Sequence, residues 1–108
     1  MYYESVFVLS GQLSEKAASD KFGEFIKSIE SSGAKILKKE FWGLRELAYK
    51  IKKNSRAYYY MINSDCDSSL LNSFHSKVKL DENFLRFLNI KIKQVDDFNS
   101  PLVERGKK

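Results

Sequence analysis

The centre of the chain reads KILKKEFWGLRELAYKIKKNSRAYYYMIN, residues 35–63, and this segment predicts two strands joined by a basic connector. Its second half, residues 57–63, is rich in aromatic and β-branched residues, which is strong strand composition. The first half is a long extended run in which Gly43 indicates a bulge or the close approach of another backbone. Lysines dominate the connector at residues 50–55.

The flanking segments each predict one strand and one helix. Residues 2–9 have strand composition, Ser14 suits a helix N-cap, and Gly33 suits the left-handed position that ends a helix. Residues 65–69 offer several caps for a second helix, and residues 84–93 alternate as a half-buried strand does. The order β-α-β-β-α-β predicts an α+β, ferredoxin-like sandwich, a four-stranded antiparallel sheet with two helices on one face. We expect one domain at residues 1–98 and a flexible basic tail at residues 99–108.

Alternation along the strands assigns side chains to the two faces of this sheet. The set expected to point at the helices is Phe7, Leu9, Tyr58, Tyr60, Ile62, Leu88 and Ile90. The set expected on the open face is Glu4, Val6, Val8, Tyr59, Met61, Phe87 and Asn89. A shift of one residue would exchange the two sets. An open face this apolar predicts a binding surface.

The composition limits the chemistry that is open to the chain. Its 108 residues are 43% hydrophobic, which suits one domain with a modest core. Cys66 is the one cysteine and His75 the one histidine, so we expect no disulfide framework, no metal site and no cofactor. No apolar run approaches the ~18 residues of a membrane span, and we expect no signal peptide because Glu4 interrupts the first apolar run. We therefore expect a soluble protein of a reducing compartment.

Positive charge is concentrated in one block of the chain. The net charge is +5, and residues 35–56 alone hold eight Lys or Arg against two Glu. A localised basic stripe on a small domain is typical of proteins that bind polyanions. Charge alone leaves two interpretations open, a nucleic-acid partner and a solvated lysine-rich surface.

Enzymatic interpretations find little support in the residues. His75 and Cys66 stand in no catalytic motif, and acidic neighbours disfavour a thiolate at Cys66. The carboxylates at positions 65, 67, 81 and 82 fall at the two ends of one predicted helix. Acyl-phosphate hydrolases of this topology need an arginine in the first strand–helix loop, and residues 10–13, SGQL, contain none. We expect no enzyme, no catalytic residue and no small-molecule substrate.

The segment WGLRELAYKI, residues 42–51, resembles the second-strand signature of the bacterial small-subunit ribosomal protein S-six (S6) family. The family pattern is Trp or Leu, Gly, a basic or apolar residue, Arg, Arg, Leu, Ala, Tyr, Pro, Ile. The opening Tyr3-Glu4 before an apolar strand is similar as well, and so is the element order through about residue 98. Glu46 stands where the family has its second arginine, so the RNA or partner contact of that arginine is not carried over. Lys50 stands where the family has proline, so the fixed turn geometry of proline is not carried over either.

This resemblance implies a structural role in the ribosome, in the cytoplasm. The family binds the central domain of small-subunit ribosomal RNA together with ribosomal protein S-eighteen. The residues expected to neutralise RNA phosphates are Arg45, Lys50, Lys52, Lys53, Arg56, Lys91 and Lys93. Those expected to contact the protein partner are Val6, Val8, Tyr59, Met61, Phe87 and Asn89. Trp42 and Tyr49 are expected to serve mainly in packing.

Two other functions stay open on the sequence. A free-standing RNA-recognition module would stack bases on Tyr3, Tyr59 and Phe87, although the sequence pattern of such modules is absent around residues 57–61. A regulatory domain of the same topology would sense a small molecule and dimerise through its sheet. A steep loss of affinity with salt distinguishes a phosphate binder from such a dimer.

Overall fold

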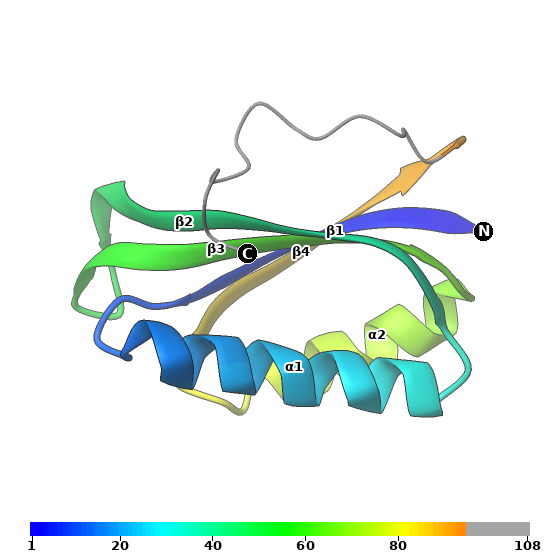
Figure 1. Cartoon of the computed structure of the whole chain (residues 1–108), viewed down its shortest axis with the longest axis horizontal. Coiled ribbons are helices and arrows are strands. Elements are labelled where there is room, and N and C mark those ends of the chain that lie inside the picture. The colour runs from blue at the N-terminus through cyan, green and yellow to red at the C-terminus, as the bar shows by residue number, and fades with distance from the viewer. Residues whose placement is uncertain (95–108) are drawn as a thin grey trace.

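Six secondary-structure elements follow one another in the predicted order. The computed structural model describes residues 1–94. The elements are β1 (Tyr2–Ser10), α1 (Glu15–Ser31), β2 (Lys35–Ile51), β3 (Asn54–Asp65), α2 (Ser68–Val78) and β4 (Phe84–Ile92). The strands form one sheet in the order β2-β3-β1-β4, every neighbouring pair is antiparallel, and both helices cover one face (Figure 1). The ferredoxin-like fold is confirmed, whereas the predicted tail lies outside the described residues.

Both ends of α1 follow local sequence signals. Ser14 caps the helix, because its hydroxyl oxygen accepts a hydrogen bond from the Ala17 N–H at 3.1 Å. Gly33 follows the helix with a φ of 110°, a backbone conformation that glycine adopts at low cost. Asp67 is the N-cap residue of α2, without a side-chain cap bond. Both helices lie where the sequence predicts them, but only α1 has a side-chain cap.

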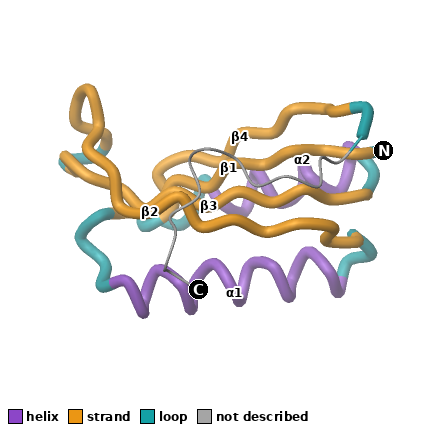
Figure 2. The backbone as a smooth tube through the Cα atoms, turned by 45° about the horizontal axis from the view of Figure 1, so that its top comes forward, coloured by secondary structure: helices purple, strands orange, loops and turns teal. Residues whose placement is uncertain are grey.

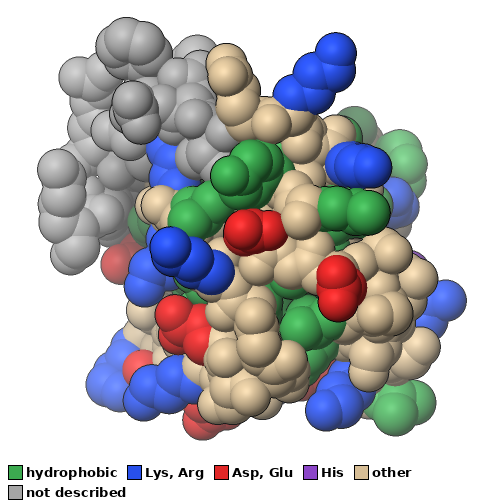
Figure 3. Space-filling model, turned by 90° about the vertical axis from the view of Figure 1, so that its right-hand side faces the viewer, with side chains coloured by type: hydrophobic (Ala, Val, Ile, Leu, Met, Phe, Trp, Pro, Cys, Tyr) green, Lys and Arg blue, Asp and Glu red, His purple; other side chains and the backbone are tan. Residues whose placement is uncertain are grey.

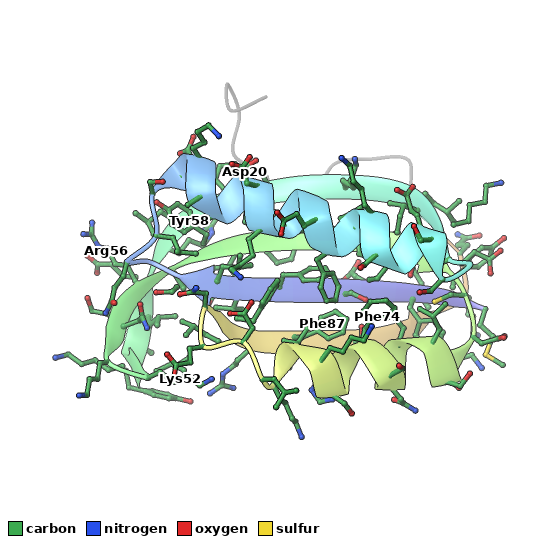
Figure 4. The ribbon with its side chains drawn as sticks, turned by 90° about the horizontal axis from the view of Figure 1, so that it is seen from below. Asp20, Lys52, Arg56, Tyr58, Phe74 and Phe87 are labelled. Atoms are coloured by element: carbon green, nitrogen blue, oxygen red, sulfur yellow. The ribbon has the colours of Figure 1, made fainter. Side chains whose placement is uncertain are left out.

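Phenylalanine rings form the centre of the core between the sheet and the helices. Phe7 of β1 is fully buried, and its ring centroid lies 4.8 Å from that of Phe87 on β4 and 5.0 Å from that of Phe25 on α1. Phe74 of α2 joins the cluster through Phe25, at 5.4 Å. Figure 4 shows Phe74 and Phe87 between α2 and the sheet. The cluster thus ties both helices to β1 and β4.

The predicted face assignment is wrong for β4. Phe87 stands opposite Phe7 and is 4% exposed, so it lies in the core and not on the open face. Asn89 follows on the same side, where its Oδ1 accepts a hydrogen bond from the Ser5 hydroxyl at 2.5 Å. The β4 side chains on the open face are instead Leu88 and Ile90, both more than half exposed.

The strand whose face assignment is wrong, β4, also contains a bulge. Leu9 of β1 pairs with Phe84, but its neighbour Val8 pairs with Arg86, which leaves Leu85 as an extra residue in β4. Phe84 and Leu85 are both buried, in different clusters, so the alternation is broken at the start of the strand. The regular alternation further along the strand does not reveal which set lies inside.

A second, smaller apolar cluster covers one part of the open face. Val8, Ala57 and Leu85 are its buried members, and Leu47 and Ile51 of β2 pack against them. Figure 2 shows the end of the β2–β3 hairpin rising out of the sheet. The hairpin end is therefore fixed to the domain by apolar contacts and not only by its strand pairing. The assignment of β1 and β3 side chains to the two faces is confirmed.

Replacing Gly11 with alanine is expected to destabilise this arrangement. The Gly11 N–H donates a hydrogen bond to the carbonyl oxygen of Arg56 at 3.1 Å, and a methyl group at Gly11 would lie 2.3 Å from that oxygen. We expect Gly11→Ala to lower the free energy of unfolding by roughly 1–3 kcal/mol. Urea denaturation measures the change.

Gly23 of α1 supplies the matched control. An added methyl group there has nothing within 4 Å, so we expect Gly23→Ala to raise the free energy of unfolding by roughly 0.5–1 kcal/mol. A Gly11→Ala protein as stable as Gly23→Ala would contradict the close approach of the β1–α1 loop to β3.

Candidate nucleic-acid interface

A two-residue turn at Lys52 and Lys53 forms the tip of the β2–β3 hairpin. Ile51 pairs with Asn54 across the turn, and the two lysines have φ values of 47° and 68°. Positive φ at both central positions is what a type I′ hairpin turn requires, and Asn-Gly is its preferred sequence. Each lysine in this left-handed region costs roughly 1–2 kcal/mol. The tip is therefore strained, and both lysine side chains are exposed.

Asn54 holds the turn in place from inside. It is 6% exposed, and its amide nitrogen donates hydrogen bonds to the carbonyl oxygens of Ile51 and Lys52, at 3.3 and 3.1 Å. Its Oδ1 accepts a hydrogen bond from the Ser10 hydroxyl at 2.7 Å. These bonds connect the tip to β1, so the direction of the turn is set by the body of the domain.

A four-residue bulge in β2 contains the next basic residue, Lys50. Glu46 pairs with Arg56 and Ile51 with Asn54, so residues 47–50 of β2 stand opposite a single residue of β3. Leu47 points inward to the open-face cluster, while Lys50 is exposed. The bulge thus presents a cation outward while its apolar residue anchors it.

A second irregularity in β2 precedes Arg45. Gly43 has a φ of 91°, and the Arg45 Nε donates a hydrogen bond to the Trp42 carbonyl oxygen at 2.9 Å. The Trp42 Nε1 in turn donates to the carboxylate of Glu40 at 2.8 Å, and the Lys38 Nζ lies 3.2 Å from that buried carboxylate. The predicted bulge at Gly43 is confirmed, and the guanidinium of Arg45 is oriented by its own strand.

The structure brings five of the seven predicted RNA-binding residues to one end of the sheet. We call this set the hairpin-end basic surface: Arg45, Lys50, Lys52, Lys53 and Arg56. All five are exposed. Lys52 and Arg56 are seen together at this end in Figure 4.

Lys91 and Lys93 lie at the opposite end of the sheet. Lys91 pairs with Tyr3 near the start of β1, whereas Ser10 at the end of β1 pairs with Ala57, the neighbour of Arg56. At about 3.3 Å per residue the two ends are roughly 20 Å apart. Figure 3 looks at the distant end and shows basic and acidic side chains interspersed there. The two lysines therefore do not extend the hairpin-end basic surface.

An apolar strip on the open face beside the hairpin is exposed at Tyr49, Leu88 and Ile90 and half-buried at Val6 and Tyr59. We call it the open-face strip: Val6, Tyr49, Tyr59, Leu88 and Ile90. Tyr49, Tyr59 and Leu88 line a hollow of about 240 Å³. Tyr49 is 70% exposed, so its expected role in packing is wrong. Val8 and Met61 do lie on this face, but at 3% and 2% exposed they offer little area to a partner.

Sequence reasoning missed Leu88 and Ile90 as surface residues. The features that identify them are the bulge and Phe87. Because Phe87 pairs with Phe7, it belongs in the core, and Leu88 and Ile90 therefore point to the other face. These features depend on the register between β1 and β4, which is set by residues almost 80 positions apart. A single sequence does not contain it.

The described residues offer neither a metal site nor an activated thiol. Within residues 1–94, no group of three or more His, Cys, Asp or Glu is placed to hold a metal ion. Burial raises the pKa of the Cys66 thiol, so the reactive thiolate is disfavoured. No helix in this part of the chain is long and apolar enough to cross a bilayer. The hairpin-end basic surface and the open-face strip are therefore the two candidate surfaces beside the hairpin.

Comparison with known proteins identifies the family. The sequence profile of the family described as Ribosomal protein S6 matches residues 2–91. Small ribosomal subunit protein bS6 of Rickettsia prowazekii is 38% identical over 103 residues, covering 95% of this chain and 85% of that protein. The bS6 protein of Rickettsia canadensis is 37% identical over the same shares.

A solved structure agrees with these relatives. The crystal structure of 30S ribosomal protein S6 from Thermotoga maritima has a TM-score of 0.76 and 28% identity, over 82% of this chain and 84% of that one. The relatives are structural proteins of the ribosome, which confirms the expectation that the chain is not an enzyme. The family match extends from β1 through most of β4, and the chain belongs to the ribosomal protein S6 family of the small ribosomal subunit.

Proposed function

We propose that this protein binds the central domain of small-subunit ribosomal RNA together with ribosomal protein S-eighteen. The observation that carries the proposal is the convergence of five exposed Lys and Arg on the hairpin-end basic surface. Cations grouped in this way neutralise neighbouring phosphates and release counterions, so the affinity falls steeply with salt. They position the protein on the RNA backbone without reading bases.

The open-face strip is the surface we assign to the protein partner. Leu88 and Ile90 are 51% and 60% exposed, and Tyr49 on the β2 bulge lines the same hollow as Leu88. Covering the exposed part of two such aliphatic side chains would stabilise a complex by on the order of 2 kcal/mol. The strip adjoins the hairpin, so RNA and protein partner would meet this domain side by side. An RNA contact at Lys91 and Lys93 stays a separate prediction.

Exchanging Leu88 and Ile90 for serine is expected to remove the cooperation between the two partners. The unchanged protein should bind a central-domain RNA fragment about tenfold more tightly with S-eighteen than without it, a gain of ~1.4 kcal/mol. The Leu88→Ser/Ile90→Ser protein should bind the RNA alone as before and lose that gain. Fluorescence anisotropy of labelled RNA measures both affinities.

The control is Leu80→Ser, which changes a side chain that is 87% exposed just beyond α2. Equal RNA affinities with and without S-eighteen would contradict the cooperative proposal. Self-association of the unchanged protein that is abolished by Leu88→Ser/Ile90→Ser would instead support a dimer formed through the sheet.

A further inference from the structure

A groove along the outer edge of β4 gathers cations from three separate elements. Its volume is about 270 Å³. The basic side chains lining it are Lys52 of the hairpin tip, His75 of α2, Lys79 just after α2, and Arg86 of β4. Its apolar lining comes from Val78, Phe84, Leu85, Phe87 and Leu88. No Asp or Glu is among these lining residues, and we call the feature the cationic edge groove.

The hairpin tip reaches this groove from across the domain. Figure 4 shows Lys52 at the hairpin end, on the side where β4 begins. Burial of Asp81 opposes its ionisation, but hydrogen bonds from Lys21 and from the Asn83 N–H, with the charges of Lys21 and Lys52, hold the pKa of that carboxyl below its usual range. Lys52 therefore lies close to the α2–β4 connection, while the Asp81 carboxylate is engaged by the Lys21 Nζ at 2.5 Å.

Helix electrostatics explains only part of the charge. Lys79 stands at the C-terminal end of α2, where a cation is favourable in any helix, and His75 lies in the last turn. Lys52 and Arg86 belong to other elements, the hairpin tip and β4, so the sequence of α2 does not account for their presence in the groove. Lys52 adopts a strained backbone conformation as well. The convergence of these two side chains on the groove is the feature that points to an anionic ligand.

Among anionic ligands, the RNA backbone fits better than an acidic peptide added to the sheet edge. The bulge at Leu85 interrupts the regular ladder of β4, and bulges oppose the pairing of a further strand. Lys52 belongs to both the hairpin-end basic surface and the groove, so the cationic surface is continuous around the tip. The guanidinium of Arg86 and the ammonium groups of Lys52 and Lys79 suit phosphate oxygens.

We propose that the cationic edge groove binds a phosphate of the RNA backbone, so that the RNA contact continues from β2 around the hairpin tip to β4. This inference rests on the proposed function, because it extends the same contact to a second face. The groove residues outside the hairpin, Lys79 and Arg86, are exposed and take no part in the core. Removing their side-chain charges therefore leaves the fold intact.

The test compares three double variants, each of which removes two positive charges. They are Lys79→Ala/Arg86→Ala in the groove, Arg45→Ala/Lys50→Ala on the hairpin-end basic surface, and Lys16→Ala/Lys27→Ala on the exposed side of α1 as the control. The probe is a central-domain fragment of small-subunit ribosomal RNA, titrated between about 50 and 200 mM salt. We expect the groove variant to bind about tenfold more weakly at low salt. The slope of log affinity against log salt should fall by about 0.7–0.9, the change expected for the loss of one phosphate contact.

The three variants separate the failure of this inference from the failure of the proposed function. If the groove variant behaves like the α1 control while Arg45→Ala/Lys50→Ala weakens binding, the groove is not an RNA site and the proposed function stands. If neither variant differs from the control, both proposals fall. Binding of a poly-aspartate peptide that is lost in the groove variant, with RNA affinity unchanged, would assign the groove to acidic peptides and overturn the inference.

Discussion

Phe7→Ala is expected to lower the free energy of unfolding by about 3–5 kcal/mol, the largest loss of stability predicted for this domain. Phe7 is fully buried, and its ring meets those of Phe22, Phe25, Phe84 and Phe87, with centroids 4.8 to 6.4 Å apart. Truncation removes the transfer free energy of the ring and leaves a cavity where both helices meet β1 and β4. Native domains hold only about 5–15 kcal/mol in total, so much of the stability would go.

Urea denaturation followed by circular dichroism measures the loss, with Tyr49→Ala as the aromatic control. Tyr49 is 70% exposed, so its removal should change the free energy of unfolding by no more than about 0.5 kcal/mol. Phe7→Leu keeps most of the volume and gives a folded variant if Phe7→Ala does not fold. A loss below about 1 kcal/mol for Phe7→Ala would contradict the central place given to this ring.

The fold follows from signals that are short in the sequence. The Ser14 cap, Gly33 and the apolar stripe of α2 at Leu71, Phe74 and Val78 place the helices. The strands are predicted by composition, and their order leaves few topologies to consider. Each of these signals lies within about a dozen residues, and local propensity and periodicity are effective at that range.

The errors concern features that depend on pairing between distant segments. The sequence predicts a connector at residues 50–55, but both strands continue to a two-residue turn, because Asn54 and the open-face cluster stabilise a hairpin that Lys52-Lys53 does not signal. The wrong face assignment of β4 side chains depends on the bulge in the pairing of β4 with β1. The separation of Lys91 from the hairpin likewise needs the register.

The candidate site was predictable in its chemistry and only partly in its geometry. The charge block at residues 35–56 holds all five members of the hairpin-end basic surface, so local charge density identified them. The cationic edge groove was not visible in the sequence, since Lys52 and Arg86 are 34 positions apart and meet only through the fold. Surfaces assembled from several elements appear only once the strands are in register.

Lys52→Glu/Lys53→Glu is expected to weaken binding to central-domain RNA by on the order of a hundredfold, about 1.4 kcal/mol for each lysine. Two cations at the exposed tip of a turn fixed by Asn54 are replaced by two anions facing phosphate. Anisotropy titrations at low salt measure the loss. Lys16→Glu/Lys27→Glu on α1 controls for the change of four units in net charge. An equal loss in that control would mean that net charge alone, and not the hairpin tip, governs binding.

A different substitution at Lys52 and Lys53 is expected to change the free energy of unfolding and the RNA affinity in opposite directions. Lys52→Asn/Lys53→Gly supplies the residues that the turn prefers, so it should raise the free energy of unfolding by about 1–2 kcal/mol as the left-handed strain is relieved. It also removes two charges, so RNA affinity should fall by roughly tenfold. Opposite changes in the two quantities would indicate that the strained lysines are kept for contact with phosphate. A variant that is more stable and binds RNA as tightly as before would leave the strain unexplained and contradict the role given to the tip.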